Sequence, residues 1–144
     1  AAVPVGTGVT NTSPPVLQMR LVVEAVDFDE ALHFYRDVLG LPEQAAFQGE
    51  GDARVVILDA GRATLELANP AQKAMIDAVE VGHPASPHLR VAFEVADGEG
   101  VTRRLLDGGA QLIASPTRTP WRSLNSRLDA PAGLQLTIFE ELDA

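Results

Sequence analysis

Two charged pairs with the same spacing stand out in this chain, Arg20 with Glu24 and Arg90 with Glu94. A guanidinium stays protonated at physiological pH and can fork onto a carboxylate or carbonyl, whereas a carboxylate accepts hydrogen bonds or acts as a general base. Residues four apart in an extended strand project from the same face. Each pair therefore predicts a strand with one polar face, suited to holding a polar small molecule.

The segments that carry these pairs are copies of one unit. RLVVEAVD at 20–27 aligns with RVAFEVAD at 90–97, and LDA at 58–60 aligns with LDA at 128–130. Both alignments have the same offset, and self-similarity at a fixed offset indicates a repeated structural unit. We predict that the chain contains two copies of one folding unit.

Each copy begins with an apolar strand that ends at an Asp, a residue type that caps helices. Helices are expected at 29–39 and 98–107, and each is followed by glycine. Alternating apolar residues predict three strands after each helix. These strands are expected at 43–48, 54–59 and 63–68 in the first copy, and at 110–114, 122–128 and 134–140 in the second. The unit is βαβββ, and the predicted fold class is α+β with a curved mixed sheet.

Length and composition favour one compact domain, because 144 residues with 46% apolar and 22% charged side chains are ordinary for a globular protein. Residues 1–18 carry no charge and are rich in Pro, Gly and Thr, which is typical of a tail or arm. The domain is expected to span 19–141. It would comprise a first module at about 19–69, a connecting helix at about 70–82, and a second module at about 88–141.

Charge and residue usage exclude several classes of partner. The formal net charge of −9 repels nucleic acid and anionic membrane surfaces. Cysteine is absent, which removes disulfides, thiolate metal sites and a cysteine nucleophile. No run approaches the roughly 18 apolar residues needed to span a bilayer, and the first residues lack the basic start and apolar block that are typical of a signal peptide. A cytoplasmic protein with a small-molecule partner is expected.

Two motifs carry a resemblance to a known family. EAVDFDEALHFYRDVLGLPE resembles the first helix, and TPWRSLNSRLDAPAGLQLTIFEEL the last hairpin, of vicinal-oxygen-chelate proteins, the glyoxalase and bleomycin-resistance-like superfamily. The similarity spans about 19–141. It implies two tandem βαβββ modules that form a cup-shaped mixed sheet open to one side, and it also implies a homodimer.

The resemblance further implies four metal ligands in the cup, a His on the first strand and a Glu on the last strand of each module. In this chain the two His positions hold Arg20 and Arg90, and the two Glu positions hold Glu66 and Thr137. Arginine has no lone pair to give, and its charge repels a cation. We therefore expect a pocket without a metal and without a cofactor.

The predicted ligand-binding residues are Arg20, Glu24, Glu66, Arg90, Glu94, Trp121 and Thr137. Two interpretations of the arginines stay open. They either pair with the three glutamates as buried ions, or one guanidinium remains available to a ligand. Phe47 and Asn125 are further candidates for the mouth of the cup, with Trp121 beside them, and ordinary hairpin packing is the alternative for the tryptophan.

The leading functional interpretation is a metal-free cup that binds a small, partly aromatic or carboxylated molecule. The alternative is a metal-independent isomerase, lyase or hydrolase with Glu66 as catalytic base and Arg20 or Arg90 stabilising an oxyanion. Arginine charge near Glu66 stabilises its carboxylate and weakens it as a base, which favours binding. Metal-dependent glyoxalase or dioxygenase chemistry would require His88 to become a ligand.

Overall fold

The computed structural model describes residue 15 and residues 17–143, and it confirms the α+β fold class. In chain order the elements are α1 (Phe28–Leu32), the π-helix η1 (His33–Val38), β1 (Glu43–Gln48), β2 (Arg54–Leu58), α2 (Pro70–Glu80), β3 (Val91–Glu94), α3 (Gly98–Asp107), β4 (Gln111–Arg118), β5 (Ser123–Ala130), the 3-10 turn η2 (Pro131–Gly133) and β6 (Leu134–Glu141).

The second half of the chain has the predicted βαβββ order. Its four strands form one sheet in the order β3-β6-β5-β4, with β3 parallel to β6 and the other neighbours antiparallel. Helix α3 has the predicted bounds because its ends carry strong local signals. The Asp97 carboxylate accepts a hydrogen bond from the Gly100 amide at 3.0 Å, and Gly108 caps the other end.

Alternation along β5 sends neighbouring side chains to opposite faces of this sheet. Leu128 is fully buried in the apolar core with Leu105 of α3. Its neighbour Arg127 is also fully buried, but it contacts Asp77 and Glu80 of α2. The two helices therefore cover opposite faces. We call the face that carries Arg127, Gln135 and Thr137 the α2 face.

The first half of the chain is less complete. Asp27 caps α1 through the Glu30 amide, and α1 continues directly into η1, so the predicted helix at 29–39 exists but is π-helical after Leu32. The hairpin β1–β2 matches two of the predicted strands.

The strands predicted at 20–27 and 63–68 are not formed in the structure, although both segments alternate as expected. A strand needs a hydrogen-bonded neighbour, and neither segment lies in a ladder with another part of the described chain. Both segments are mostly exposed, including Val22 at 88% and Leu67 at 86%. Apolar side chains that the repeat assigns to a sheet thus face water.

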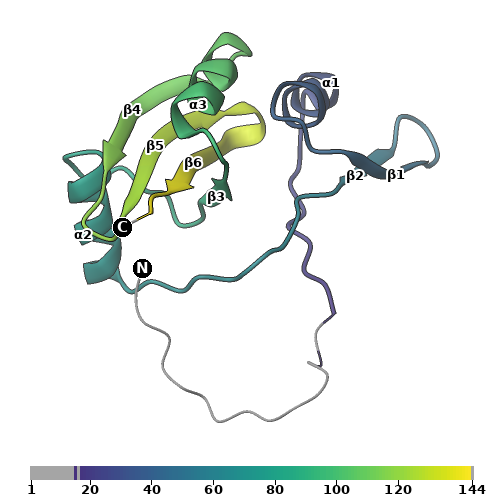
Figure 1. The fold of residues 1–144 in the computed structure, drawn as a ribbon. Helices are drawn as coiled ribbons and strands as arrows, with labels where there is room; N and C mark the ends of the chain where they lie inside the picture. The colour runs from purple at the N-terminus through teal and green to yellow at the C-terminus, as the bar shows by residue number, and fades with distance from the viewer. Residues whose placement is uncertain (1–14, 16, 144) are drawn as a thin grey trace.

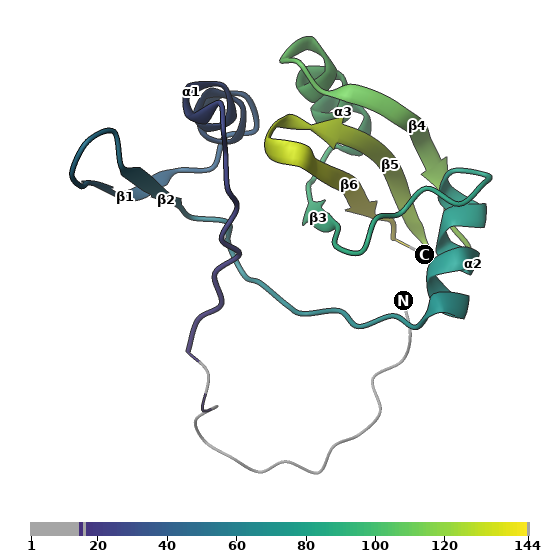
Figure 2. The same ribbon diagram turned by 180° about the vertical axis from the view of Figure 1, so that it is seen from behind.

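Figures 1 and 2 show α1, β1 and β2 on one side of the molecule and the β3–β6 sheet on the other, joined by the extended segment 59–69. The two halves also touch through α1 and η1. Phe34 is buried in the same core cluster as Leu105, and the Tyr35 hydroxyl donates to the Pro131 carbonyl at 2.8 Å. This contact joins the first helix to the turn between β5 and β6.

Helix α2 lies where the connecting helix was predicted, with Asn69 as its cap and Pro70 at its first turn. It ends at Glu80, two residues before the predicted end, and Gly82 follows with a φ of +95° that ends the helical path.

Most of the predicted tail at 1–18 lies outside the described residues, so the predicted domain limits stay predictions. Within the part of the chain that is described, no helix is long and apolar enough to cross a membrane.

Candidate functional site

The structure brings together two of the predicted site residues, Arg90 and Thr137. Arg90 lies one residue before β3, and Thr137 lies on the neighbouring strand β6, where it pairs with Ala92. The Arg90 Nη1 atom donates a hydrogen bond to Thr137 Oγ1, and Thr137 is only 2% exposed. The guanidinium is therefore positioned by a buried hydroxyl on the α2 face of the sheet.

Arg90 has no carboxylate within ion-pair distance among the described residues, although it is half-buried. Its Nε atom is sealed from solvent and has no hydrogen-bond partner there. Burial lowers the pKa of Arg90, and the charge of Arg127 lowers it further, while the more distant carboxylates of Glu80, Glu66 and Asp77 oppose this. The site thus holds a partly dehydrated cation that no anion of the described residues pairs.

The other predicted glutamates and arginine do not contact Arg90. Arg20 and Glu24 are exposed on the extended segment before α1, and Glu66 is exposed on the segment before α2. Glu94 is on β3 but also exposed. The internal ion pairs considered from the sequence are not formed among the described residues. Glu66 reaches Arg90 only through its longer-range charge.

The three further candidates, Trp121, Phe47 and Asn125, belong to different elements. Trp121 is half-buried in the turn between β4 and β5, and Phe47 on β1 is 59% exposed. Asn125 is buried on β5, and its amide donates to Glu80 Oε2 at 2.8 Å. Asn125 thereby links β5 to α2 through a side-chain hydrogen bond.

Arg127, which the sequence analysis did not single out, is the centre of a buried charge network. It is 0% exposed and forms ion pairs with Asp77 at 3.0 Å and Glu80 at 2.6 Å. Its Nη1 atom also donates to Gln135 Oε1 and to Ser86 Oγ, both at 2.9 Å. These contacts fix α2 and the following loop to β5 and β6.

Asp77 ties the loop after α2 into the same network. Its carboxylate accepts from the backbone amides of Ala85 at 3.0 Å and Ser86 at 2.9 Å, and from the Ser86 hydroxyl. Burial raises the pKa of Asp77, but these hydrogen bonds and Arg127 outweigh it and hold the pKa well below its usual value. Asp77 therefore stays ionised at neutral pH and is a poor base.

One sequence signal could have indicated this network. Asp77 and Glu80 are three residues apart and so share one face of a helix. Arg127 takes the polar place in the alternation of β5. Their pairing could not be found from spacing alone, because nothing in the sequence shows on which sheet face α2 would lie.

The metal site that the family resemblance implies does not fit these residues. The described chain contains no group of three or more His, Asp or Glu side chains that could hold a metal ion. Arg90 occupies one of the implied ligand positions, and its guanidinium offers only N–H donors and positive charge. Thr137 occupies another, and its hydroxyl oxygen accepts a hydrogen bond from Arg90. We derive no chemical step through a metal.

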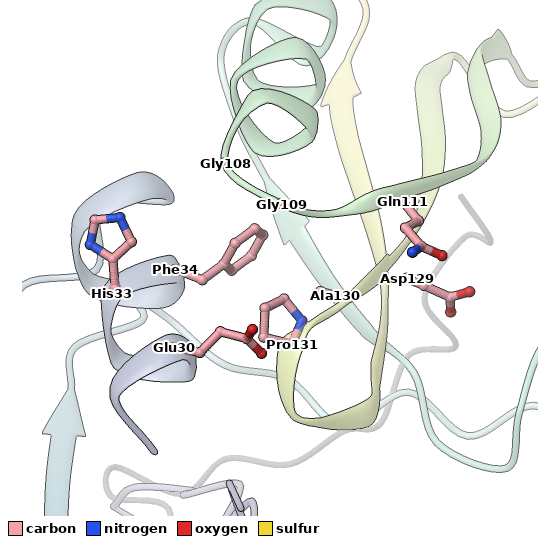
Figure 3. A pocket seen from close by; sticks show the side chains of 9 residues that line it. All are labelled: Glu30, His33, Phe34, Gly108, Gly109, Gln111, Asp129, Ala130 and Pro131. Carbon is pink, nitrogen blue, oxygen red and sulfur yellow. The ribbon is translucent and has the colours of Figure 1, made fainter. Parts of the chain in front are cut away.

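One hollow in the described surface does not include Arg90 in its lining. A shallow pocket of about 360 Å³ lies between the α1–η1 helix and the β5–β6 turn. Figure 3 shows Phe34 extending into it between Gly109 and Pro131. It is lined by Glu30, His33, Phe34, Gly108, Gly109, Gln111, Asp129, Ala130 and Pro131. None of these is a predicted site residue, and we assign no function to this pocket.

Comparison with known proteins places the fold. Residues 19–138 match the family described as Glyoxalase/Bleomycin resistance protein/Dioxygenase superfamily. A glyoxalase family protein from Bacillus cereus is 20% identical, with a TM-score of 0.56 over 92% of this chain and 99% of its own. A superfamily member from Sphaerobacter thermophilus is 21% identical, with a TM-score of 0.55 over 83% and 92%.

TioX from a Micromonospora species is 21% identical, with a TM-score of 0.54 over 88% of this chain and 98% of its own. At these identities the likeness concerns the fold alone. No curated protein matches the chain. The family match covers nearly all of the region in which the repeat and the βαβββ order were found, and the chain belongs to the Glyoxalase/Bleomycin resistance protein/Dioxygenase superfamily.

Proposed function

We propose that this protein binds a small, carboxylated or partly aromatic molecule on the α2 face of the β3–β6 sheet without a metal ion. The observation that carries the proposal is Arg90, a half-buried guanidinium that Thr137 positions and that no carboxylate of the described chain pairs. A dehydrated cation of this kind gains more from a ligand anion than an exposed one does. Arg90 is the expected ligand contact, with Thr137 beside it.

Titration calorimetry in the presence of a chelator tests the proposal. The wild-type chain, Arg90→Gln and Arg118→Gln would be titrated with a panel of aliphatic and aromatic carboxylates and their neutral amides. Arg118 is exposed at the end of β4, so Arg118→Gln is a matched change of charge away from the site. Binding of at least one carboxylate should weaken by about 10-fold or more in Arg90→Gln alone, which corresponds to about 1.4 kcal/mol. Silence across the panel, or equal loss in both variants, would reject it.

A catalytic role for Glu66 is the second candidate, because its charge is one of those that act on Arg90. In that case Glu66 would abstract a proton from a bound substrate while Arg90 or Arg20 stabilised the resulting oxyanion. Turnover of a bound carboxylate by the wild-type chain and its loss in Glu66→Gln, with unchanged affinity, would support this role. Turnover that Glu66→Gln retains would exclude it.

We further propose that the site is completed in a homodimer. Within the described chain β3 has one neighbouring strand, β6, so its other edge offers free backbone hydrogen-bonding groups. The extended segments at 19–26 and 62–68 expose apolar side chains, with Leu21 at 54% and Leu65 at 74%. A second copy of the chain would cover these surfaces and bring Arg20, Glu24 and Glu66 toward a sheet.

Sedimentation velocity distinguishes the two states. The wild-type chain and Gln72→Asp, which adds a charge on the exposed side of α2, should sediment as dimers. Leu67→Asp should sediment as a monomer, because it places a carboxylate on an apolar segment that is 86% exposed in one chain. A monomeric wild-type protein at micromolar concentration would contradict the homodimer.

A further inference from the structure

We propose that α2 is a displaceable lid over an anion-binding subsite, and that its own Asp77 and Glu80 carboxylates occupy that subsite when the lid is closed. The subsite consists of Arg127, Asn125 and Gln135 on the α2 face. Its role in admitting a ligand to Arg90 rests on the proposed function, but the motion of α2 does not.

The contact between α2 and the sheet is made mainly by charges. The buried residues of α2 are Asp77 and Glu80, whereas its apolar side chains are only half-buried or, like Met75 at 42%, exposed. Helix α3 on the opposite face differs, because its Leu105 is 0% exposed in the apolar core. The two helices are therefore attached by different forces.

Because the contact between α2 and the sheet is mainly ionic, the closed and open states of α2 are close in free energy. When the lid closes, Arg127 and its two carboxylate partners lose their hydration, and their mutual attraction roughly offsets that loss. When α2 lifts as a unit, all three charges regain water at the same time. Opening is then far less costly than deleting one partner, which would leave a buried charge unpaired.

The closed state also leaves polar atoms without partners. Arg127 Nε and Asn125 Oδ1 are sealed from solvent and unpaired within the described chain, although both residues are more than nine-tenths buried. Arg90 Nε, beside the same network, is in the same condition. Each such atom destabilises the closed state while it remains dry, because it has lost its hydration without gaining a hydrogen bond. Hydration or a polar ligand under the lifted helix would satisfy them.

The chain on the N-terminal side of α2 permits this motion. Residues 60–69 are exposed throughout and form no helix or strand. On the other side, the loop is held mainly by Asp77 itself, through the amides of Ala85 and Ser86, and by Gln135, whose amide donates to the Ala85 carbonyl at 3.0 Å. Release of Asp77 would therefore loosen the loop together with the helix.

The side chains beneath α2 indicate which class of ligand could bind there. With α2 lifted, the face presents the Arg127 guanidinium and the side-chain amides of Asn125 and Gln135, close to Arg90. Two carboxylates of α2 form ion pairs with Arg127 in the closed state, and a free dicarboxylate offers the same two groups. It would compete with the helix for the subsite and stabilise the open state.

Hydrogen–deuterium exchange of the 144-residue chain tests the proposal, with sodium succinate as the probe and succinamide as its neutral control. In the absence of a probe, α2 amides should exchange about 100-fold faster than those of β5 and β6, which indicates local opening. Succinate should speed α2 exchange by about 5-fold further, and succinamide should leave it unchanged. Glu80→Gln should speed α2 exchange, whereas Lys73→Gln, on the exposed side of α2, should not.

Two results would overturn the proposal. Exchange of α2 at the same rate as β5 and β6 would show that the helix is an integral wall that opens only on global unfolding. Equal effects of succinate and succinamide would remove the anion subsite. Neither result tests ligand binding by Arg90. Conversely, the absence of binding in the calorimetric panel would reject the proposed function but would not change the exchange rates expected for α2.

Discussion

Replacement of Arg90 by methionine separates a binding residue from a structural one. If Arg90 were part of a buried ion pair, its removal would leave a carboxylate unpaired and cost about 3–5 kcal/mol of stability. No carboxylate of the described chain lies within ion-pair distance of Arg90, so this penalty does not arise. Loss of the hydrogen bond from the charged Arg90 to Thr137 costs about 1.5–3 kcal/mol.

Removal of the guanidinium also stabilises the folded state, which opposes the loss of this hydrogen bond. Its sealed, unpartnered Nε atom costs about 1–3 kcal/mol, and methionine removes that cost while it keeps most of the apolar stem. The two contributions nearly cancel. We expect Arg90→Met to change the free energy of unfolding by less than about 1 kcal/mol in either direction, while it abolishes carboxylate binding.

Urea denaturation followed by the fluorescence of the single tryptophan, Trp121, measures this difference. The midpoint for Arg90→Met should lie within about 1 M of the wild-type midpoint at an unchanged slope. Leu128→Ala serves as the reference for a structural residue. It leaves a cavity at a core position that is 0% exposed and should lower the free energy of unfolding by about 2–5 kcal/mol. A loss of about 3 kcal/mol or more in Arg90→Met would show that Arg90 is structural and would refute this reasoning.

Three further predictions concern stability. Tyr35→Phe should cost about 1 kcal/mol in urea denaturation, because the hydroxyl donates to the Pro131 carbonyl at 2.8 Å; an unchanged midpoint would show that this contact does not hold α1 to the turn. The pKa of Asp77 is lowered in the folded state, so its stabilisation is present above the unfolded value near 3.9 and is lost as the pH falls below it. Denaturation between about pH 5 and pH 2.5 should therefore show a shallower decline for Asp77→Asn than for the wild type, and parallel curves would contradict the assignment. Gly108→Ala should cost about 1–3 kcal/mol, because an added Cβ would lie 2.3 Å from Val38 Cγ1; a thermal midpoint equal to that of the wild type would mean that Val38 can move aside.

Elements with signals in their own residues were predictable from the sequence. Helix α3 has an Asp at its cap and two glycines after its end, and its bounds in the structure are those expected. The start of α2 was also predictable from neighbouring residues, since Asn69 caps the helix and Pro70 lies in its first turn. The repeat of 20–27 at 90–97 indicated the βαβββ order that the second half adopts.

Features that depend on tertiary partners were not predictable in the same way. The segments at 20–27 and 63–68 have the alternation of strands, but a ladder requires a neighbour that the described single chain does not supply. The Arg127 network depends on which face of the sheet α2 covers, and no local pattern states this. Arg90 and Thr137 could be brought together from strand alternation and the family resemblance, because Arg90 directly precedes β3 and Thr137 lies on the neighbouring strand β6 of the same repeat.

The central claim is that an unpaired arginine, and no metal ion, recognises the ligand. Affinity selection from a mixture of small metabolites, with mass-spectrometric identification, tests it most directly when wild-type and Arg90→Met proteins are compared after dialysis against chelator. The wild-type protein should enrich carboxylate-bearing compounds that Arg90→Met does not retain. Enrichment of the same compounds by both proteins, or enrichment only after a divalent metal is added back, would contradict the claim.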